Sequence, residues 1–167
     1  MNTVIDEVGL RQSGVFGPKI WTVLVSVFAQ TTWWVMITAL IFLVIIGFSV
    51  ERRTSNMKYC LLIFGGLILG VVSWCILVDD VGVMGGLTVA VSAIIGAGVA
   101  LFARLRIFLP IVGDTKLQVW MLVMIWWIVL IAATLLEMSF DIALTVLLLH
   151  FMAFLFGFIL GAIGKRK

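Results

Sequence analysis

The residues of this chain that could carry out chemistry are one imidazole and two hydroxyls, each surrounded in sequence by apolar residues. His150 is the only histidine, and Thr88 and Ser92 lie together in a separate apolar stretch. A hydroxyl activated by a neighbouring base is the minimal arrangement for nucleophilic catalysis. A histidine inside a membrane can equally satisfy its two nitrogens with a neighbouring hydroxyl and a carbonyl. An interhelical hydrogen bond is therefore the simpler interpretation of His150.

Small residues accompany both groups. Gly157 and Gly161 follow His150 at offsets of 7 and 11 residues, which return to nearly the same helical face at about 100° per residue. Such faces let two membrane helices approach closely, either within one chain or between two copies of it. The sequence does not decide the oligomeric state. We expect helix packing through the small residues Gly65, Gly66, Gly70, Gly86, Ser92, Ala93, Gly96, Gly157 and Gly161.

The elements that position these groups must lie in lipid. Of the 167 residues, 64% are apolar and 11% are charged, whereas soluble domains have roughly 45–50% and about 25%. A water-soluble globule of this size cannot bury such an apolar excess. The composition also excludes a disordered chain, a nucleic-acid platform and a disulfide scaffold.

Apolar stretches of helical length then define the fold class. A helix needs about 20 mostly apolar residues to cross the hydrocarbon core, and continuous runs favour helices over the alternating strands of a barrel. The sequence therefore predicts an all-α polytopic membrane protein. Its five predicted spans lie at about 33–50, 59–77, 86–103, 117–136 and 142–163.

Basic residues gather on one side of these spans. Nine of the eleven Lys and Arg residues lie in the first loop, the third loop and the tail, whereas the second and fourth loops carry Asp79, Asp80, Glu137 and Asp141. The positive-inside rule predicts a cytoplasmic C-terminus and an external N-terminus. Short loops fit a prokaryotic plasma membrane, and an organellar inner membrane would look similar.

One membrane domain is expected over 20–163, between an external arm at 1–19 and a basic cytoplasmic tail at 164–167. The arm lacks the basic region and apolar core of a cleavable signal peptide. The stretch 20–29 is too short to span alone and is expected at the interface or as an extension of the first helix. Cys60 and Cys75 are expected to be buried small hydrophobic residues. A lone histidine without nearby ligands predicts no metal site, and no cofactor motif occurs.

Several ordered motifs resemble the rhomboid intramembrane proteases and their inactive relatives. The rhomboid nucleophile motif G-x-S-G continues as G-A-S-G-A-I-F-G-L-L-G-A, and the segment 86–97 reads GLTVAVSAIIGA. In the last helix of that family a histidine is followed by glycines at the seventh and eleventh positions, as are His150, Gly157 and Gly161. Further matches to the second and third helices of the family are Phe28, Gly47, Glu51, Gly65, Gly66 and Gly70.

The resemblance implies a rhomboid-like bundle without the first rhomboid helix and with a degenerate active site. In register, the serine is Thr88, the glycine after it is Val89, and the second-helix histidine and asparagine that support the oxyanion are Val35 and Ala39. Only the base, His150, is retained. Because loss of one oxyanion donor costs about 10²–10³ in rate, we expect a pseudoprotease. The resemblance also implies that the segment 79–85 dips into the membrane before Thr88.

Three functions follow, in order of preference. The first is a non-catalytic accessory or structural subunit of a membrane complex. It would bind transmembrane helices of partner proteins, rather than nucleic acid, through the cleft between the first and fourth spans or through the small-residue seam. The alternative is an active intramembrane protease that uses Thr88 and His150. The third is a small channel or carrier component, which a single intramembrane histidine and the lack of an inverted repeat disfavour.

Overall fold

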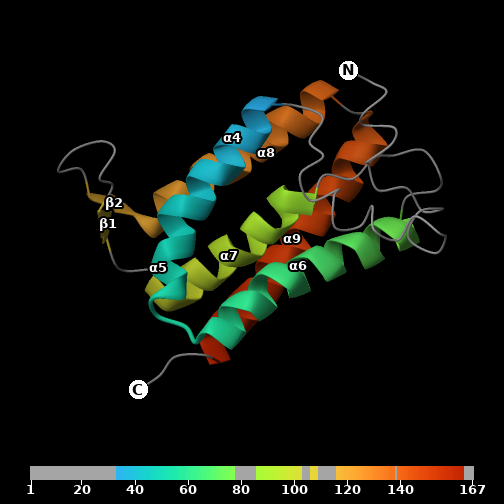
Figure 1. Cartoon of the computed structure of the whole chain (residues 1–167). Coiled ribbons are helices and arrows are strands. Elements are labelled where there is room, and N and C mark those ends of the chain that lie inside the picture. The colour runs from blue at the N-terminus through green and yellow to red at the C-terminus, as the bar shows by residue number, and fades with distance from the viewer. Residues whose placement is uncertain (1–32, 78–85, 103–105, 109–115, 138, 164–167) are drawn as a thin grey trace.

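The computed structural model describes residues 33–77, 86–102, 106–108, 116–137 and 139–163, and these ranges form a helical bundle (Figure 1). Four helical segments are long and apolar enough to cross a membrane, and a shorter apolar helix accompanies them. The predicted polytopic helical membrane fold is confirmed. The four are Trp33–Glu51, Asn56–Ser73, Val119–Leu136 and Phe140–Ile163, and the shorter helix is Gly86–Phe102.

The helices begin and end within a few residues of the predicted spans. The first span is continuous but contains a π-helical segment, so it comprises α4 (Trp33–Phe42), η1 (Leu43–Gly47) and α5 (Phe48–Glu51). The helices that follow are α6 (Asn56–Leu77), α7 (Gly86–Phe102), α8 (Val119–Glu137) and α9 (Phe140–Ile163).

Helix α7 occupies the centre of the bundle, with the other helices around it (Figure 1). Every side chain of α7 is buried or half-buried, whereas each of α4, α6, α8 and α9 exposes large apolar side chains. On α6, for example, Leu61, Phe64 and Ile68 recur at helical spacing on one exposed face. This pattern is that of four lipid-facing helices around a protein-facing one.

The π-helical segment was not predicted. It ends at Gly47, where an added Cβ would lie 2.9 Å from the Tyr59 hydroxyl of α6. Gly47 thus leaves room for Tyr59 at the point where the first two spans approach each other, near the short turn that joins them. π-Segments locally widen a helix and shift the register of the side chains that follow.

A short hairpin lies between α7 and α8, where the sequence predicted only a loop. Strand β1 (Arg106–Phe108) pairs antiparallel with β2 (Lys116–Gln118), and Arg106 lies opposite Gln118. The predicted all-α membrane bundle is confirmed, and this short strand pair is an addition in the connection between α7 and α8.

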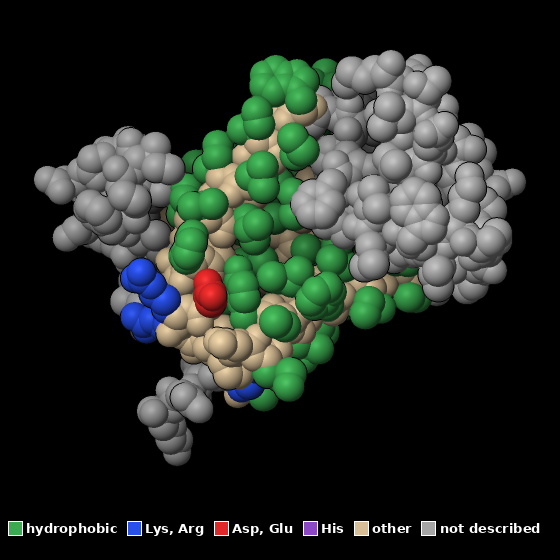
Figure 2. Space-filling model, viewed as in Figure 1, with side chains coloured by type: hydrophobic (Ala, Val, Ile, Leu, Met, Phe, Trp, Pro, Cys, Tyr) green, Lys and Arg blue, Asp and Glu red, His purple; other side chains and the backbone are tan. Residues whose placement is uncertain are grey.

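The charged side chains in the described ranges lie at the ends of the bundle. Glu51, Arg52, Arg53 and Lys58 are exposed near the turn between α5 and α6, and Figure 2 shows basic side chains gathered at one end of the bundle with an acidic side chain nearby. Asp141 is exposed at the start of α9, which runs through the bundle so that its C-terminal end lies beside the start of α6 (Figure 1). The apolar surface in Figure 2 covers the helices between these ends. Predictions for 1–19, 20–29, 79–85 and 164–167 fall outside the described residues.

Candidate functional site

The site is built on a seam in which α7 and α9 come into backbone contact. Gly157 of α9 lies against the carbonyl group of Ala93, and Gly96 of α7 lies against the carbonyl group of Phe154. At Gly161, an added Cβ would be 2.9 Å from the Cα of Ala97. None of these positions has room for a side chain, so the two helices can approach this closely only because glycine stands there.

The close approach brings His150 to Thr88. The imidazole Nε2 lies 3.1 Å from the Thr88 hydroxyl, and Nδ1 lies 2.8 Å from the carbonyl oxygen of Val146. A carbonyl only accepts hydrogen bonds, so we assign the imidazole hydrogen to Nδ1. Nε2 is then the acceptor, and the Thr88 hydroxyl donates to it. Both residues are buried, with 4% of each exposed.

This arrangement is that of a hydroxyl nucleophile and its base. The base faces the hydroxyl with an unprotonated nitrogen, and the carbonyl of Val146 fixes its tautomer and orientation. The same two bonds also satisfy both polar atoms of a buried imidazole, which is the structural role that such a pair can have in a membrane. The geometry of the pair permits both roles, so the groups around it decide between them.

A second hydrogen-bonded contact joins α7 to α8. The indole nitrogen of Trp126 donates to the Ser92 hydroxyl at 3.1 Å, and Ser92 donates to the backbone carbonyl of Thr88 at 3.1 Å. Ser92 is fully buried and Trp126 is 1% exposed. Polar contacts on α7 therefore link it to both α8 and α9 through adjacent turns.

Comparison with known proteins identifies the family. A family model described as the Rhomboid domain matches residues 17–167, which is most of the chain. The chain belongs to the rhomboid family. Searches among curated proteins and among solved structures gave no significant match. The chain is thus a rhomboid-domain integral membrane protein.

In the register predicted from the rhomboid motif, three further positions hold apolar side chains: Val89 next to Thr88 in the chain, and Val35 and Ala39 on α4. Val89 is 1% exposed, and Ala39 on α4 is fully buried in the main apolar cluster of the bundle. Val35 is half-buried one turn earlier on α4. None of the three carries a side-chain donor, and Val89 adds a branched side chain beside the hydroxyl.

The glycines of the third rhomboid-type helix face inward. An added Cβ at Gly66 of α6 would lie 3.0 Å from the Cβ of Ala93 on α7, and one at Gly65 would lie 2.6 Å from the Phe156 ring of α9. Gly70 is buried on the same helix, and Gly86 is buried at the start of α7. In the described part of the chain these glycines, like Gly157 and Gly161, lie at helix contacts within the molecule.

The sequence interpretation missed Trp126. It lies in a buried stripe of α8 with Leu122 and Leu130, each four residues away, so an apolar core position was the natural expectation. The signal that could have revealed its partner is Ser92, a buried polar residue on α7 that needs a donor. Tryptophan carries one donor and commonly pairs it when buried.

The prediction for the cysteines is wrong at Cys60, which is exposed on α6. A thiol is weakly polar, so a lipid-facing position is also compatible with its chemistry. Within the described ranges, no three His, Cys, Asp or Glu side chains come together as a group that could hold a metal ion.

Proposed function

We propose that this rhomboid-family protein is a non-catalytic subunit that binds transmembrane helices of partner proteins. The proposal rests on the contrast between the retained polar pair and the apolar residues at the predicted motif positions. The Thr88–His150 hydrogen bond remains at 3.1 Å, while the motif positions for oxyanion support hold Val35 and Ala39. Such a site keeps the bond that joins two helices and lacks the groups that stabilise a transition state.

The energetic argument rests on those absent donors. Removing one oxyanion donor costs about 10²–10³ in rate, so the apolar groups at two such positions leave the hydroxyl a weak catalyst. The nearest polar groups described on α7 and α8 are engaged elsewhere, because Ser92 donates to the Thr88 carbonyl and Trp126 donates to Ser92. These bonds support a packing role for the polar groups.

The packing of the helices favours the edge between α4 and α8 as the side on which a partner helix binds. The α7–α9 seam is filled by its own backbone atoms, so it has no room for another helix. By contrast, α4 and α8 share only a small interface, in which the Phe42 and Trp126 rings lie 5.1 Å apart. We therefore assign this edge to the partner helix.

We further propose that the partner belongs to another polypeptide of a membrane complex and that the basic end of the bundle is cytoplasmic. The positive-inside rule supports this orientation. The exposed basic residues Arg52, Arg53 and Lys58 lie at one end, and the exposed Asp141 lies at the other. The described loops are short, which supports recognition within the bilayer.

Site-specific photo-crosslinking tests the binding side. Trp127 of α8 contacts Phe151 and Phe154 of α9, so Ile125, on the opposite flank of Trp126, lies toward the α4 edge. Ile125 is 44% exposed, and Ile68 on the distant exposed face of α6 is 61% exposed. A photo-reactive residue at Ile125 should cross-link a discrete membrane protein, and the matched residue at Ile68 should cross-link lipid only. Equal protein cross-linking at both positions would contradict the proposal.

Intramembrane proteolysis is the second candidate, and the Thr88–His150 bond favours it. It predicts cleavage of a transmembrane substrate in proteoliposomes and loss of that cleavage in both Thr88→Ala and His150→Ala. The non-catalytic proposal predicts equal, background amounts of product from all three proteins and no labelling by a fluorophosphonate.

A further inference from the structure

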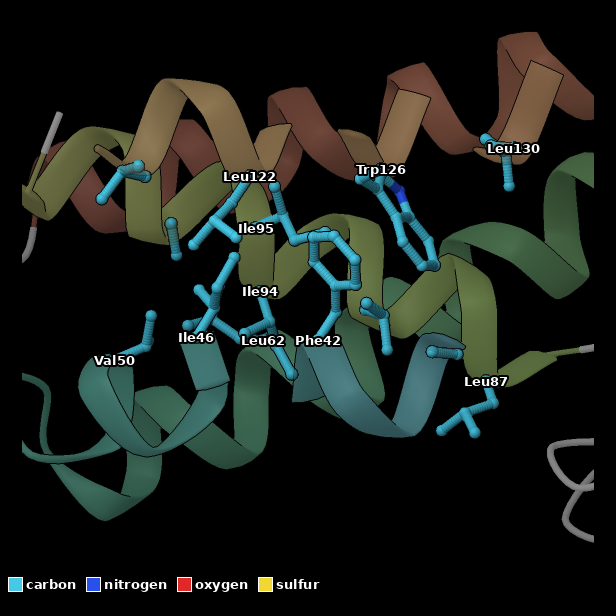
Figure 3. Packing of buried hydrophobic residues seen from close by; sticks show 14 of the residues in the cluster. Phe42, Ile46, Val50, Leu62, Leu87, Ile94, Ile95, Leu122, Trp126 and Leu130 are labelled. Atoms are coloured by element: carbon cyan, nitrogen blue, oxygen red, sulfur yellow. The ribbon is translucent and has the colours of Figure 1, made fainter. Parts of the chain in front are cut away.

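One exposed face of the first span ends in an arginine. Val44 and Phe48 are exposed on this face, and Arg52 follows Phe48 by one helical turn. Ile46 and Val50 of the same span lie instead in the buried cluster shown in Figure 3. The span ends at the residue before Arg52, so the apolar face lies in the bilayer and the arginine lies at its surface.

Hydrogen bonds hold the backbone of the turn that follows. The backbone N–H of Arg52 donates to the carbonyl of Phe48 at 3.2 Å, and those of Arg53 and Thr54 donate to the carbonyl of Val50 at 3.0 Å each. The Thr54 hydroxyl donates to the same carbonyl at 2.9 Å. The two arginines therefore extend from a backbone whose position is fixed relative to the first span.

The guanidinium of Arg53 lies over the ring of Phe102, 5.6 Å from its centroid. Phe102 is buried at the end of α7, so this contact keeps Arg53 against the end of the bundle. A guanidinium that stacks through its face keeps its N–H donors in the plane of the group. Within the described ranges neither Arg52 nor Arg53 forms an ion pair, although the exposed Glu51 precedes them in the chain.

We propose that this face of the first span binds an anionic phospholipid. The headgroup phosphate accepts hydrogen bonds from Arg52 and Arg53, whose planar donor groups match pairs of phosphate oxygens. An acyl chain lies along Phe48 and Val44. The two arginines and Glu51 leave one net positive charge, which favours an anionic over a zwitterionic headgroup. A lipid fits better than a soluble anion because only a lipid also covers the apolar face, and the site does not depend on partner binding.

Photo-crosslinking lipids in liposomes test the site. The two probes are a phosphatidylglycerol and a phosphatidylcholine with the same diazirine-bearing acyl chain, each at a low fraction in a phosphatidylcholine bilayer that holds the full chain. One net positive charge at the surface corresponds to a preference of about 5-fold. We expect that excess of phosphatidylglycerol adduct at Val44 and Phe48. Leu144 and Leu148 are exposed on α9 after the acidic Asp141, and they should show no such excess.

Charge variants separate the site from the general charge of this end of the bundle. The double variant Arg52→Gln/Arg53→Gln should reduce the preference at Val44 and Phe48 to about 1-fold or less. Lys58→Gln is the matched control, because it removes an exposed positive charge from the first turn of α6 at the same end. It should retain a preference of about 5-fold. The double variant Arg52→Lys/Arg53→Lys keeps the charge but loses the planar donor groups, so its preference should be lower than that of the unaltered protein.

Two results from the charge variants would overturn the proposal. One is a preference that persists in the double Gln variant, with phosphatidylcholine adducts like those of the unaltered protein showing that the variant is folded. The other is an equal loss in Lys58→Gln, because the general charge of this end would then explain the preference.

Inorganic phosphate separates a lipid from a soluble anion. At equal ionic strength it should reduce the preference no more than chloride does, since both screen the arginines. A larger loss in phosphate would assign the arginines to a free anion and overturn lipid binding. Full retention of the preference in the double Lys variant would overturn the paired phosphate contact.

Discussion

The backbone of Gly157 on α9 lies directly against the carbonyl group of Ala93 on α7, with no room for a side-chain atom between them. This contact fixes the distance between the two helices, and that distance places His150 within hydrogen-bonding reach of Thr88. A packing feature of the backbone therefore determines the geometry of the polar pair.

Substituting Gly157→Ala should separate the helices. The added methyl group overlaps the Ala93 carbonyl, so we expect a loss of about 1–3 kcal/mol in the free energy of unfolding. Unfolding in detergent or by steric trapping measures it. Met152→Ala, at an exposed position of the same helix, is the control and should change stability by less than about 0.5 kcal/mol. A fully stable Gly157→Ala protein would show that the seam is looser than described.

The Thr88–His150 bond should be measurable as a coupling energy. Thr88→Val removes the hydroxyl with little change in shape and leaves Nε2 without its donor, which should cost about 1–3 kcal/mol. His150→Leu removes the other partner. Thr88 takes part in interactions besides this bond, so the double variant is needed to isolate the pair. We expect a coupling of about 0.6–1.7 kcal/mol from the cycle, and additive effects would argue against a bond that contributes to stability.

Restoring the serine should not restore a protease. Thr88→Ser supplies the family nucleophile but leaves Val89 and Ala39 unchanged, so cleavage of a transmembrane substrate should stay at background. Adding Val89→Gly and Ala39→Asn should raise the rate, since one recovered oxyanion donor contributes about 10²–10³. Measurable cleavage by Thr88→Ser alone, abolished by His150→Ala, would contradict this account.

The orientation can be tested by thiol labelling of intact cells. Ser55 and Ser139 are both exposed and lie in connections at opposite ends of the bundle. In a protein without its native cysteines, a membrane-impermeant maleimide should label Ser139→Cys from outside and reach Ser55→Cys only after the membrane is opened. The reverse pattern would place the basic end outside.

Much of the fold was predictable because the membrane imposes it. Five apolar runs predicted the helices to within a few residues, since lipid leaves the backbone no alternative to internal hydrogen bonds. The spacing of Gly157 and Gly161 after His150 predicted one shared helical face, and both glycines lie against the backbone of α7. The family resemblance added Thr88 as the partner of His150, which no local pattern could supply across 62 residues.

The missed features depend on contacts between distant elements. The π-segment ends where Gly47 contacts Tyr59 of the next helix. The periodicity of apolar residues along the first span cannot predict that contact. The pairing of Trp126 with Ser92 joins α8 to α7, yet each residue also fits its own helix as an ordinary core position. The β1–β2 hairpin has strands of only three residues, too short for alternation to distinguish them from a loop.

The central position of α7 has a consequence for how the protein responds to its membrane. Thicker or thinner bilayers act on hydrophobic surface through tilt and mismatch, and that surface belongs to α4, α6, α8 and α9. Helix α7 has no fully exposed side chain, and its backbone is in direct contact with α9. A change in bilayer thickness should therefore alter the tilt of the outer helices, while Thr88 and His150 stay at the same height relative to each other. The hydrogen bond between them should not depend on lipid composition.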